Sequence, residues 1–287
     1  MVENMVEENY HIKVMSKQDL AIAIDWAAAE GWNPGLYDIE SFHAADPNGF
    51  LMGFLGDEAI ASISVVKYDN SYGFLGFYIV KPEFRGKGYG LKLWQAGLQY
   101  LEGCNVGLDG VVEQQGNYKQ SGFKLAYGNI RFEGFGGGDE PEGIGLVDLN
   151  ELPFSEVQDY DSAFFPTERH VFLKHWIGQT GSSALGIKQA GKLVGYGVIR
   201  PCRNGFKIGP LFADDALLAE ELFLALKSKA TPTENVYLDV PEVNLAGVAL
   251  AEKYSMEPVF TTARMYTGET PEISVNRTFG VTTFELG

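Results

Sequence analysis

Apolar and polar positions along the first half of the chain follow two periods, which predict a mixture of helices and strands. Apolar residues recur at helical spacing from Lys17 to Glu30, directly after Ser16, a residue type that caps helices, and again from Leu91 to Glu102. Short helices are predicted over Asp38–Ala45 and Glu113–Ser121. Strand-like runs bounded by turn residues cover Tyr10–Met15, Phe50–Leu55, Ala59–Tyr68, Tyr72–Val80, Asn105–Leu108 and Phe123–Phe132.

The order of elements repeats in the second half. A stretch from Gly134 to Gly145, rich in glycine and acidic residues, is too polar to pack and predicts a linker. Beyond it, Asn105-Val106-Gly107-Leu108-Asp109 recurs as Asn235-Val236-Tyr237-Leu238-Asp239, and Arg131 has a counterpart in Arg264. We therefore predict two α/β (α+β) domains, 1–134 and 147–287, joined by a linker at 135–146. Each is a mixed, mostly antiparallel sheet flanked by helices, and Phe279–Phe284 adds a last strand.

Composition and charge narrow the function classes. The 287 residues are 45% hydrophobic and 21% charged, which gives each half enough apolar material for a core. A formal charge of −16 repels nucleic acid and anionic membranes, so neither is expected as a partner. The same charge either concentrates a cationic ligand or serves solubility alone.

Four features are expected to be absent: a disulfide, a metal site, a membrane-spanning segment and a secretion signal. Cys104 and Cys202 lie far apart, and no histidine stands at ligand spacing from a cysteine or carboxylate, so we expect neither a disulfide nor a metal site. No apolar run reaches membrane-spanning length, and the acidic N-terminal residues lack the basic and apolar regions of a secretion signal. The expected location is the cytoplasm.

A glycine-rich turn, Arg85-Gly86-Lys87-Gly88-Tyr89-Gly90, lies between a strand and a helix and predicts a diphosphate site. Backbone amides and the positive end of the helix dipole attract an anion there, and the glycines allow it to approach. A dinucleotide-binding turn would follow an N-terminal strand directly, whereas this turn follows several antiparallel-looking strands and Pro82. A kinase-type P-loop would end in Gly-Lys-Ser/Thr, which is missing here.

The turn resembles the acetyl-CoA motif of the GNAT (GCN5-related N-acetyltransferase) superfamily, Arg/Gln-x-x-Gly-x-Gly/Ala, with Arg85, Gly88 and Gly90 at the motif positions. Asn117–Phe123 is similar to the family signature Tyr-x-x-x-Gly-Phe, so the resemblance implies that Tyr118 protonates the departing CoA thiolate. It also implies that main-chain groups of the preceding strand end bind the pantetheine arm and the acetyl carbonyl. The implied cofactor-binding residues are Tyr78, Ile79, Val80, Arg85, Gly86, Lys87, Gly88, Tyr89 and Gly90.

Two departures from the family pattern restrict what the resemblance implies. Val111 and Val112 stand where many members have an asparagine that contacts CoA. The second half resembles the tandem subset with a degenerate C-terminal GNAT-like domain, because Asp214 and Asp215 replace the glycines and Ala251 lies near the tyrosine position. Acidic side chains repel a diphosphate, so we expect one active site, in the first half.

The resemblance implies an N-acetyltransferase that uses acetyl-CoA as co-substrate and a primary amine as acceptor. The general base is open between Glu113 and Glu30, and Trp32 and Asn33 are expected to contact the substrate together with Glu30. The acidic chain favours a small cationic amine such as a polyamine. An amino acid, peptide or protein amine, a non-catalytic acyl-CoA-binding module and an oligomeric state all stay open.

Overall fold

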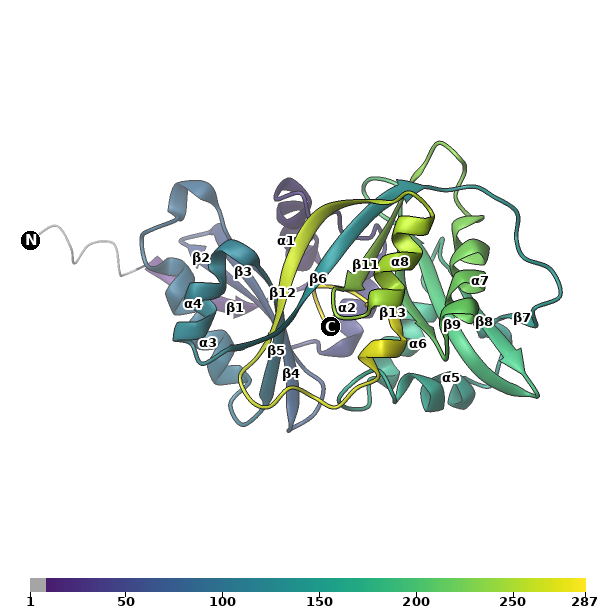
Figure 1. Ribbon diagram of the computed structural model, residues 1–287. Helices are drawn as coiled ribbons and strands as arrows, with labels where there is room; N and C mark the ends of the chain where they lie inside the picture. Colours follow the sequence, from purple (N-terminus) through teal and green to yellow (C-terminus); the bar gives the residue numbers. More distant parts are fainter. Residues whose placement is uncertain (1–8) are drawn as a thin grey trace, which may run out of the picture.

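The computed structural model describes residues 9–287, and their strands form one continuous thirteen-stranded sheet that runs through both halves of the chain (Figure 1). The strand order is β1-β2-β3-β4-β5-β12-β6-β11-β10-β9-β8-β7, and β13 pairs with β10. The pairs β4–β5 and β10–β11 are parallel and the others antiparallel, which confirms the predicted mixed, mostly antiparallel sheet. Residues 1–8, on which the expectation about a secretion signal mostly rested, lie outside the described residues.

The elements of the first half are β1 (Tyr10–Val14), α1 (Lys17–Ala29), α2 (Asp38–Ala45), β2 (Phe50–Leu55), β3 (Glu58–Lys67), β4 (Tyr72–Val80), α3 (Tyr89–Tyr100), β5 (Asn105–Val111), α4 (Gln115–Gln120) and β6 (Lys124–Phe135). Those of the second half are β7 (Leu146–Asp148), α5 (Phe154–Asp161), α6 (His170–Ile177), β8 (Ser183–Gln189), β9 (Lys192–Pro201), β10 (Phe206–Ala213), α7 (Ala216–Lys227), β11 (Asn235–Pro241), α8 (Leu245–Lys253), β12 (Glu257–Tyr266) and β13 (Thr278–Gly280).

Local signals set several of these boundaries as predicted. Ser16 caps α1 in a reciprocal capping box with Asp19: the Ser16 hydroxyl accepts from the Asp19 amide, and the Asp19 carboxylate accepts from the Ser16 amide. The predicted last strand over Phe279–Phe284 is wrong beyond its start, since β13 ends at Gly280. The linker also packs more than expected, because Gly136 and Gly137 are buried and their carbonyls accept hydrogen bonds from the Lys227 ammonium.

The two halves exchange their closing strands, an arrangement that the repeat in the sequence did not indicate. β6 belongs to the first half by chain order, yet it pairs with β11 of the second half over seven residues, from Asn129 opposite Pro241 to Phe135 opposite Asn235. β12 of the second half pairs with β5 of the first, and β6 and β12 pair with each other. In Figure 1 these two long strands cross the middle of the molecule side by side.

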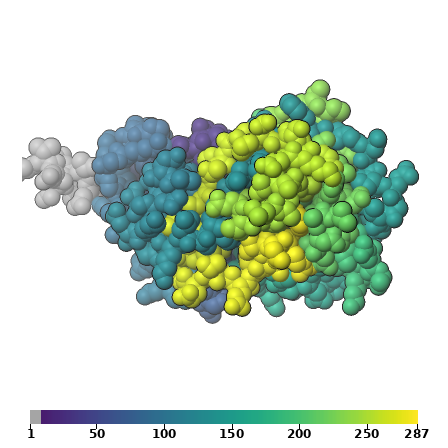
Figure 2. All heavy atoms as spheres, in the orientation of Figure 1, coloured from purple at the N-terminus to yellow at the C-terminus, as the bar shows by residue number. Residues whose placement is uncertain are grey.

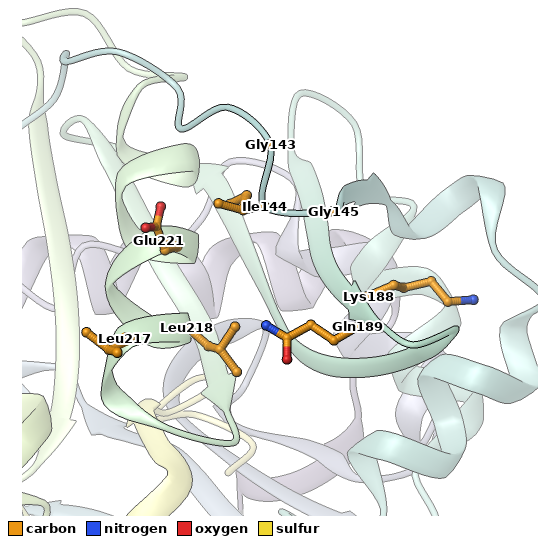
Figure 3. A pocket seen from close by; sticks show the side chains of 8 residues that line it. All are labelled: Gly143, Ile144, Gly145, Lys188, Gln189, Leu217, Leu218 and Glu221. Atoms are coloured by element: carbon orange, nitrogen blue, oxygen red, sulfur yellow. The ribbon is translucent and has the colours of Figure 1, made fainter.

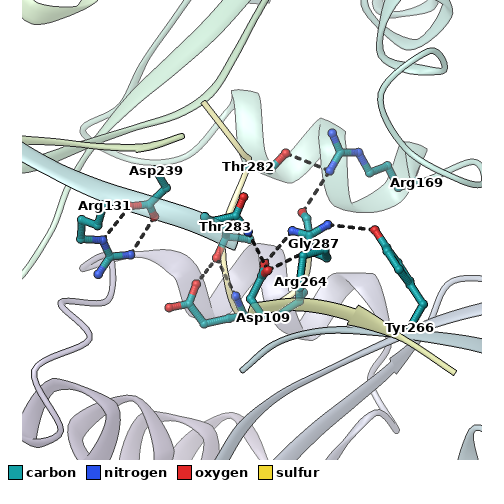
Figure 4. Close-up of polar contacts among 12 residues, drawn as sticks. Asp109, Arg131, Arg169, Asp239, Arg264, Tyr266, Thr282, Thr283 and Gly287 are labelled. Carbon is teal, nitrogen blue, oxygen red and sulfur yellow. Dashed lines mark hydrogen bonds and ion pairs between the residues drawn. The ribbon is translucent and has the colours of Figure 1, made fainter. Parts of the chain in front are cut away.

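Two buried ion pairs link the exchanged strands, and the sequence repeat relates one pair to the other. Arg131 binds both carboxylate oxygens of Asp239 at 2.7 Å, and Arg264 binds both of Asp109 at 2.8 and 2.6 Å (Figure 4). The four side chains are at most 5% exposed. Each bidentate pair therefore joins a strand of one half to a strand of the other.

The two carboxylates differ in their electrostatic surroundings. Burial alone would raise the pKa of Asp239, but Arg131, with Lys207 and Arg200 beyond it, lowers that pKa below its ordinary value. Burial raises the pKa of Asp109, because Arg264 offsets it only in part and the Asp239 charge adds to it. The carboxylate of the Asp109–Arg264 pair is thus the less favourably surrounded of the two.

Apolar residues form separate cores on the two faces of the sheet. α3 packs on the first half of the sheet, and α7 and α8 pack on the second. A third core lies between the halves, where α1 and α2 meet α5 and α6, with Phe42 stacked on Trp176 at 6.1 Å. Figure 2 shows the last part of the chain covering the middle of one face. Among residues 9–287 no helix combines the length and apolarity needed to cross a membrane.

Candidate active site

A cavity of about 910 Å³ enters the sheet between β4 and β5. The parallel pairing of these strands ends at Leu75 opposite Leu108, and both the Gly76–Val80 and the Asp109–Val111 segments line the cavity beyond that point. The β4 backbone bends there, because Phe77 and Tyr78 together face the single residue Ile63 of β3. The two strands therefore diverge and leave a wedge whose walls are main chain on both sides.

The predicted diphosphate turn lies at one end of this cavity. Gly88 is the N-cap of the twelve-residue helix α3, with a φ of +84° and no side-chain cap, and Gly86 has a φ of +73°. A Cβ atom on either glycine would meet nothing within 4 Å, so both face open space. The first amides of α3 are thus available to an anion. Gly90 is required for a different reason: a Cβ atom at this position would lie 2.6 Å from the Tyr78 hydroxyl, which is too close.

Arg85 connects the turn to the strand and to α1. Its Nε donates to the Val80 carbonyl at 2.8 Å, and its Nη2 pairs with Glu30 Oε1 at 2.5 Å. Both side chains are partly exposed, so the pair is a weak one that a diphosphate can replace.

Seven of the nine predicted cofactor residues line the cavity and two do not. The seven are Tyr78, Ile79, Val80, Arg85, Gly86, Gly88 and Gly90. Lys87 is exposed, with its ammonium 5.4 Å from the centre of the Phe84 ring, and Tyr89 is buried in the core beneath the turn. The side chains of Lys87 and Tyr89 thus point away from the cavity.

Tyr118 lies in the cavity wall, as predicted. Its ring stacks on Trp94 at 5.7 Å and lies against Gly110, where a Cβ would come within 2.1 Å of a ring carbon. Burial, with a smaller contribution from Tyr78, raises the pKa of Tyr118 to about 12. The phenol therefore keeps its proton at neutral pH and can donate it. Sequence reasoning missed Gly110, which makes room for the ring.

The two predicted bases fall in different places. Glu113 is exposed on a short 3-10 helix, Val112–Gln114, and does not line the cavity, because β5 continues to Val111 before the chain turns outward. Glu30 does line the cavity, but its carboxylate is paired with Arg85 beside the turn. The structure thus leaves Glu113 without access to the cavity.

The other end of the cavity is walled by residues that the strand exchange brings in. Trp32 lines it as predicted, and its carbonyl accepts from Arg131 Nη1 at 2.8 Å. Asn33 does not line it: its side chain binds the main chain of Asn204 and so joins the two halves. The residues that β6, β12 and the last segment contribute are Arg131, Phe260, Thr262, Phe284 and Glu285. The only signal for these residues along the chain is the repeat of Arg131 in Arg264.

The corresponding wedge in the second half is filled by the chain itself. The parallel pairing of β10 with β11 ends at Ile208 opposite Leu238, and β13 then pairs with β10. On the β11 side of this wedge, the Val281 amide donates to the Asp239 carbonyl at 2.8 Å, so the last segment bridges both strands. Asp215 caps α7 by accepting from the amides of Leu217 and Leu218, so the helix N-terminus that an anion would use is already satisfied.

A smaller cavity of about 490 Å³ lies beside the N-terminal end of α7, against the Gly143–Gly145 segment and the end of β8 (Figure 3). It shares no lining residue with the large cavity, and its Lys188 is paired with Glu156 at 2.6 Å. In the part of the chain that the structure describes, no group of three or more histidine, cysteine or acidic residues is arranged to hold a metal.

Comparisons with known proteins agree with this geometry. The profile of the Acetyltransferase (GNAT) family matches residues 18–123, and that of the Acetyltransferase (GNAT) domain matches residues 157–280. A protein of Pseudoalteromonas sp. (strain SANK 73390) named holothin acyltransferase is 33% identical over 277 residues, which cover 96% of this chain and 94% of that protein.

Two solved structures share the fold across nearly the whole chain. A Pyrococcus horikoshii protein provisionally described as an acetyltransferase has a TM-score of 0.83 at 23% identity, covering 100% of this chain and 99% of its own. A tandem GNAT protein from the clavulanic acid biosynthesis pathway has a TM-score of 0.63 at 12% identity, covering 91% of this chain and 99% of its own. The chain therefore belongs to the GNAT superfamily of acyltransferases, as a tandem protein with two GNAT units.

Proposed function

We propose that this protein is an acetyl-CoA-dependent N-acetyltransferase that acts on a small amine. The observation that carries the proposal is the continuity of one cavity. It begins at the uncapped N-terminus of α3, passes between the diverging β4 and β5, and reaches Tyr118 and the wall formed by the other half. Donor, acid and acceptor space thus lie in one enclosure.

Each part of the cavity suits one part of acetyl transfer. The α3 amides and Arg85, released from Glu30, would bind the diphosphate. The wedge beside Tyr78–Val80 would hold the pantetheine arm, and a main-chain amide near Val80 would polarise the thioester carbonyl. Tyr118 would then protonate the sulfur as the carbon–sulfur bond breaks.

The acceptor end favours a small amine over a protein lysine. β6, β12 and the last segment close this end with Arg131, Phe260 and Phe284, and Phe284 is only 7% exposed. The Thr262 side chain also lines this end, and its hydroxyl is buried without a hydrogen-bond partner. A polyamine would need several unpaired carboxylates, whereas Glu30 and Asp109 are already paired with arginines. A monoamine therefore fits this end better than the polyamine considered from the charge of the chain.

The test is a panel of acceptors assayed for released CoA with a thiol reagent. The panel contains monoamines, polyamines, amino acids and a lysine peptide, and holothin is included because the Pseudoalteromonas relative carries its name. Acetyl-CoA is compared with longer acyl-CoAs at equal concentration. We expect the highest kcat/KM with acetyl-CoA and a small monoamine. Tight acetyl-CoA binding without CoA release from any acceptor would instead identify a non-catalytic acyl-CoA-binding module.

A further inference from the structure

Glu285 places a carboxylate in the cavity wall from a segment far away in sequence. The residue is 5% exposed and lines the cavity. Its main chain lies directly against Gly76, where a Cβ would come within 2.3 Å of the Glu285 carbonyl oxygen. Gly76 is the first residue of β4 after its pairing with β5 ends. Glu285 is thereby held where the wedge opens, next to the strand that would hold the thioester.

Glu285 differs from the other acidic residues of the cavity wall in having no ion pair. Of the carboxylates that line the cavity, Glu30 is paired with Arg85 and Asp109 with Arg264. Among the described residues, Glu285 accepts a side-chain hydrogen bond from the Thr283 hydroxyl on Oε2, while Oε1 has no partner and is not sealed from solvent. One oxygen is therefore oriented by the chain and the other is free.

Three cations approach this carboxylate, each from a different strand: Arg131 on β6, Arg200 on β9 and Lys207 on β10. Arg131 is neutralised by Asp239, and Arg200 by Asp38 at 3.0 Å. Lys207 is 1% exposed and its ammonium has no hydrogen-bond partner; burial, together with Arg131, lowers its pKa. Among the described residues, Glu285 is thus the one carboxylate of this buried group that has no ion pair and that also lines the cavity.

We infer that Glu285 is the general base of the reaction, an inference that rests on the proposed acetyl transfer. The amine nitrogen forms a bond to the acetyl carbon, and the carbon–sulfur bond breaks with its electron pair going to sulfur. The proton lost by the nitrogen goes to Glu285, and the sulfur takes a proton from Tyr118. Proton exchange with water then restores both side chains, so the reaction consumes and releases no net proton.

The experiment compares Glu285→Gln with the wild type on the best amine of the acceptor panel. The amide keeps the shape and the Thr283 contact but cannot take a proton. We expect kcat to fall by about 100-fold or more, with acetyl-CoA affinity by calorimetry and the melting temperature unchanged. The variant should react only with amine that reaches the site as its free base, so its rate should rise with pH more steeply than that of the wild type up to the pKa of the amine. Glu285→Asp should recover part of kcat. Glu272→Gln changes an exposed glutamate on the preceding segment and should match the wild type.

The possible outcomes separate this inference from the proposed function. If the wild type acetylates an amine and Glu285→Gln keeps its kcat and pH profile, the base assignment is overturned while acetyl transfer stands. A variant that loses kcat together with acetyl-CoA affinity and thermal stability, but keeps the wild-type pH profile, would show that Glu285 only holds the last segment in place, which also overturns the assignment. If the wild type acetylates nothing, both fall together.

Discussion

The ion pair between Asp109 and Arg264 gives a direct test of how the strand exchange is held together. Arg264→Met removes the guanidinium and keeps an unbranched apolar stem over the Phe74 ring, whose centre lies 5.0 Å from the guanidinium carbon. The Asp109 carboxylate then stays buried with the Asn129 amide, at 2.7 Å, as its remaining partner. The substitution therefore leaves a charge on β5 without its counter-ion on β12.

The expected loss of stability is large because both side chains are buried, at 5% exposure for Arg264 and 0% for Asp109. Removing one partner of such a pair costs about 3–5 kcal/mol in the free energy of unfolding. Burial already raises the pKa of Asp109, and the loss of Arg264 raises it further. Between its unfolded pKa, about 3.9, and its folded pKa, the native state then binds more protons than the unfolded state, so stability falls as pH rises through that window. The deficit of the variant should therefore shrink on acidification.

Urea unfolding followed by tryptophan fluorescence measures these quantities at pH 7 and pH 5. The double variant Asp109→Asn/Arg264→Met removes both charges and keeps an acceptor for the Asn129 amide, so it should recover most of the loss. A single variant within about 1 kcal/mol of the wild type, or a double variant no more stable than the single one, would refute the reasoning.

Three further changes test the site. Gly88→Glu should abolish acetyl-CoA binding in calorimetry, because it places a carboxylate at the α3 N-terminus. The control Gly88→Ala shares the strain of a φ of +84° without the charge and should keep measurable affinity. Equal acetyl-CoA affinities of Gly88→Glu and the wild type would contradict the site. Tyr118→Phe should lower kcat by about 10²–10⁴-fold at unchanged acetyl-CoA affinity, and an unaltered kcat would mean that another acid acts. Asp215→Ala should lower the free energy of unfolding by about 1 kcal/mol, because α7 loses its N-cap. The variant should still bind one acetyl-CoA per chain, since β13 fills the second wedge, and two bound molecules would refute that interpretation.

The sequence predicted those features that depend on local patterns. The helix cap at Ser16, the helix over Asp38–Ala45 and the strand over Tyr72–Val80 follow from short-range patterns, and the structure confirms them. The family motif likewise identified Arg85, Gly88 and Tyr118, because their positions follow from one strand, one turn and one helix in succession.

What the sequence could not predict depends on contacts between distant segments. Glu285 lies more than two hundred residues from Gly76 along the chain, and no periodic pattern marks it. Glu113 was predicted as a base because it follows the strand beside the acceptor groove, but it lies on the exposed 3-10 helix after β5. Lys87 and Tyr89 belong to the motif in sequence, but the turn directs their side chains to solvent and to the core.

The repeat itself explains why the exchange of β6 and β12 was not visible. Arg131 and Arg264 occupy equivalent places, as do Asp109 and Asp239, so a first half that closed on its own β6 could pair Arg131 with Asp109 just as well. The ion pairs therefore do not select the exchanged arrangement. What distinguishes it is the cavity wall: with β12 beside β5, Phe260 and Thr262 of the second half line the acceptor end. The second half, whose own wedge is filled by β13, thus contributes part of the wall of the first half's cavity.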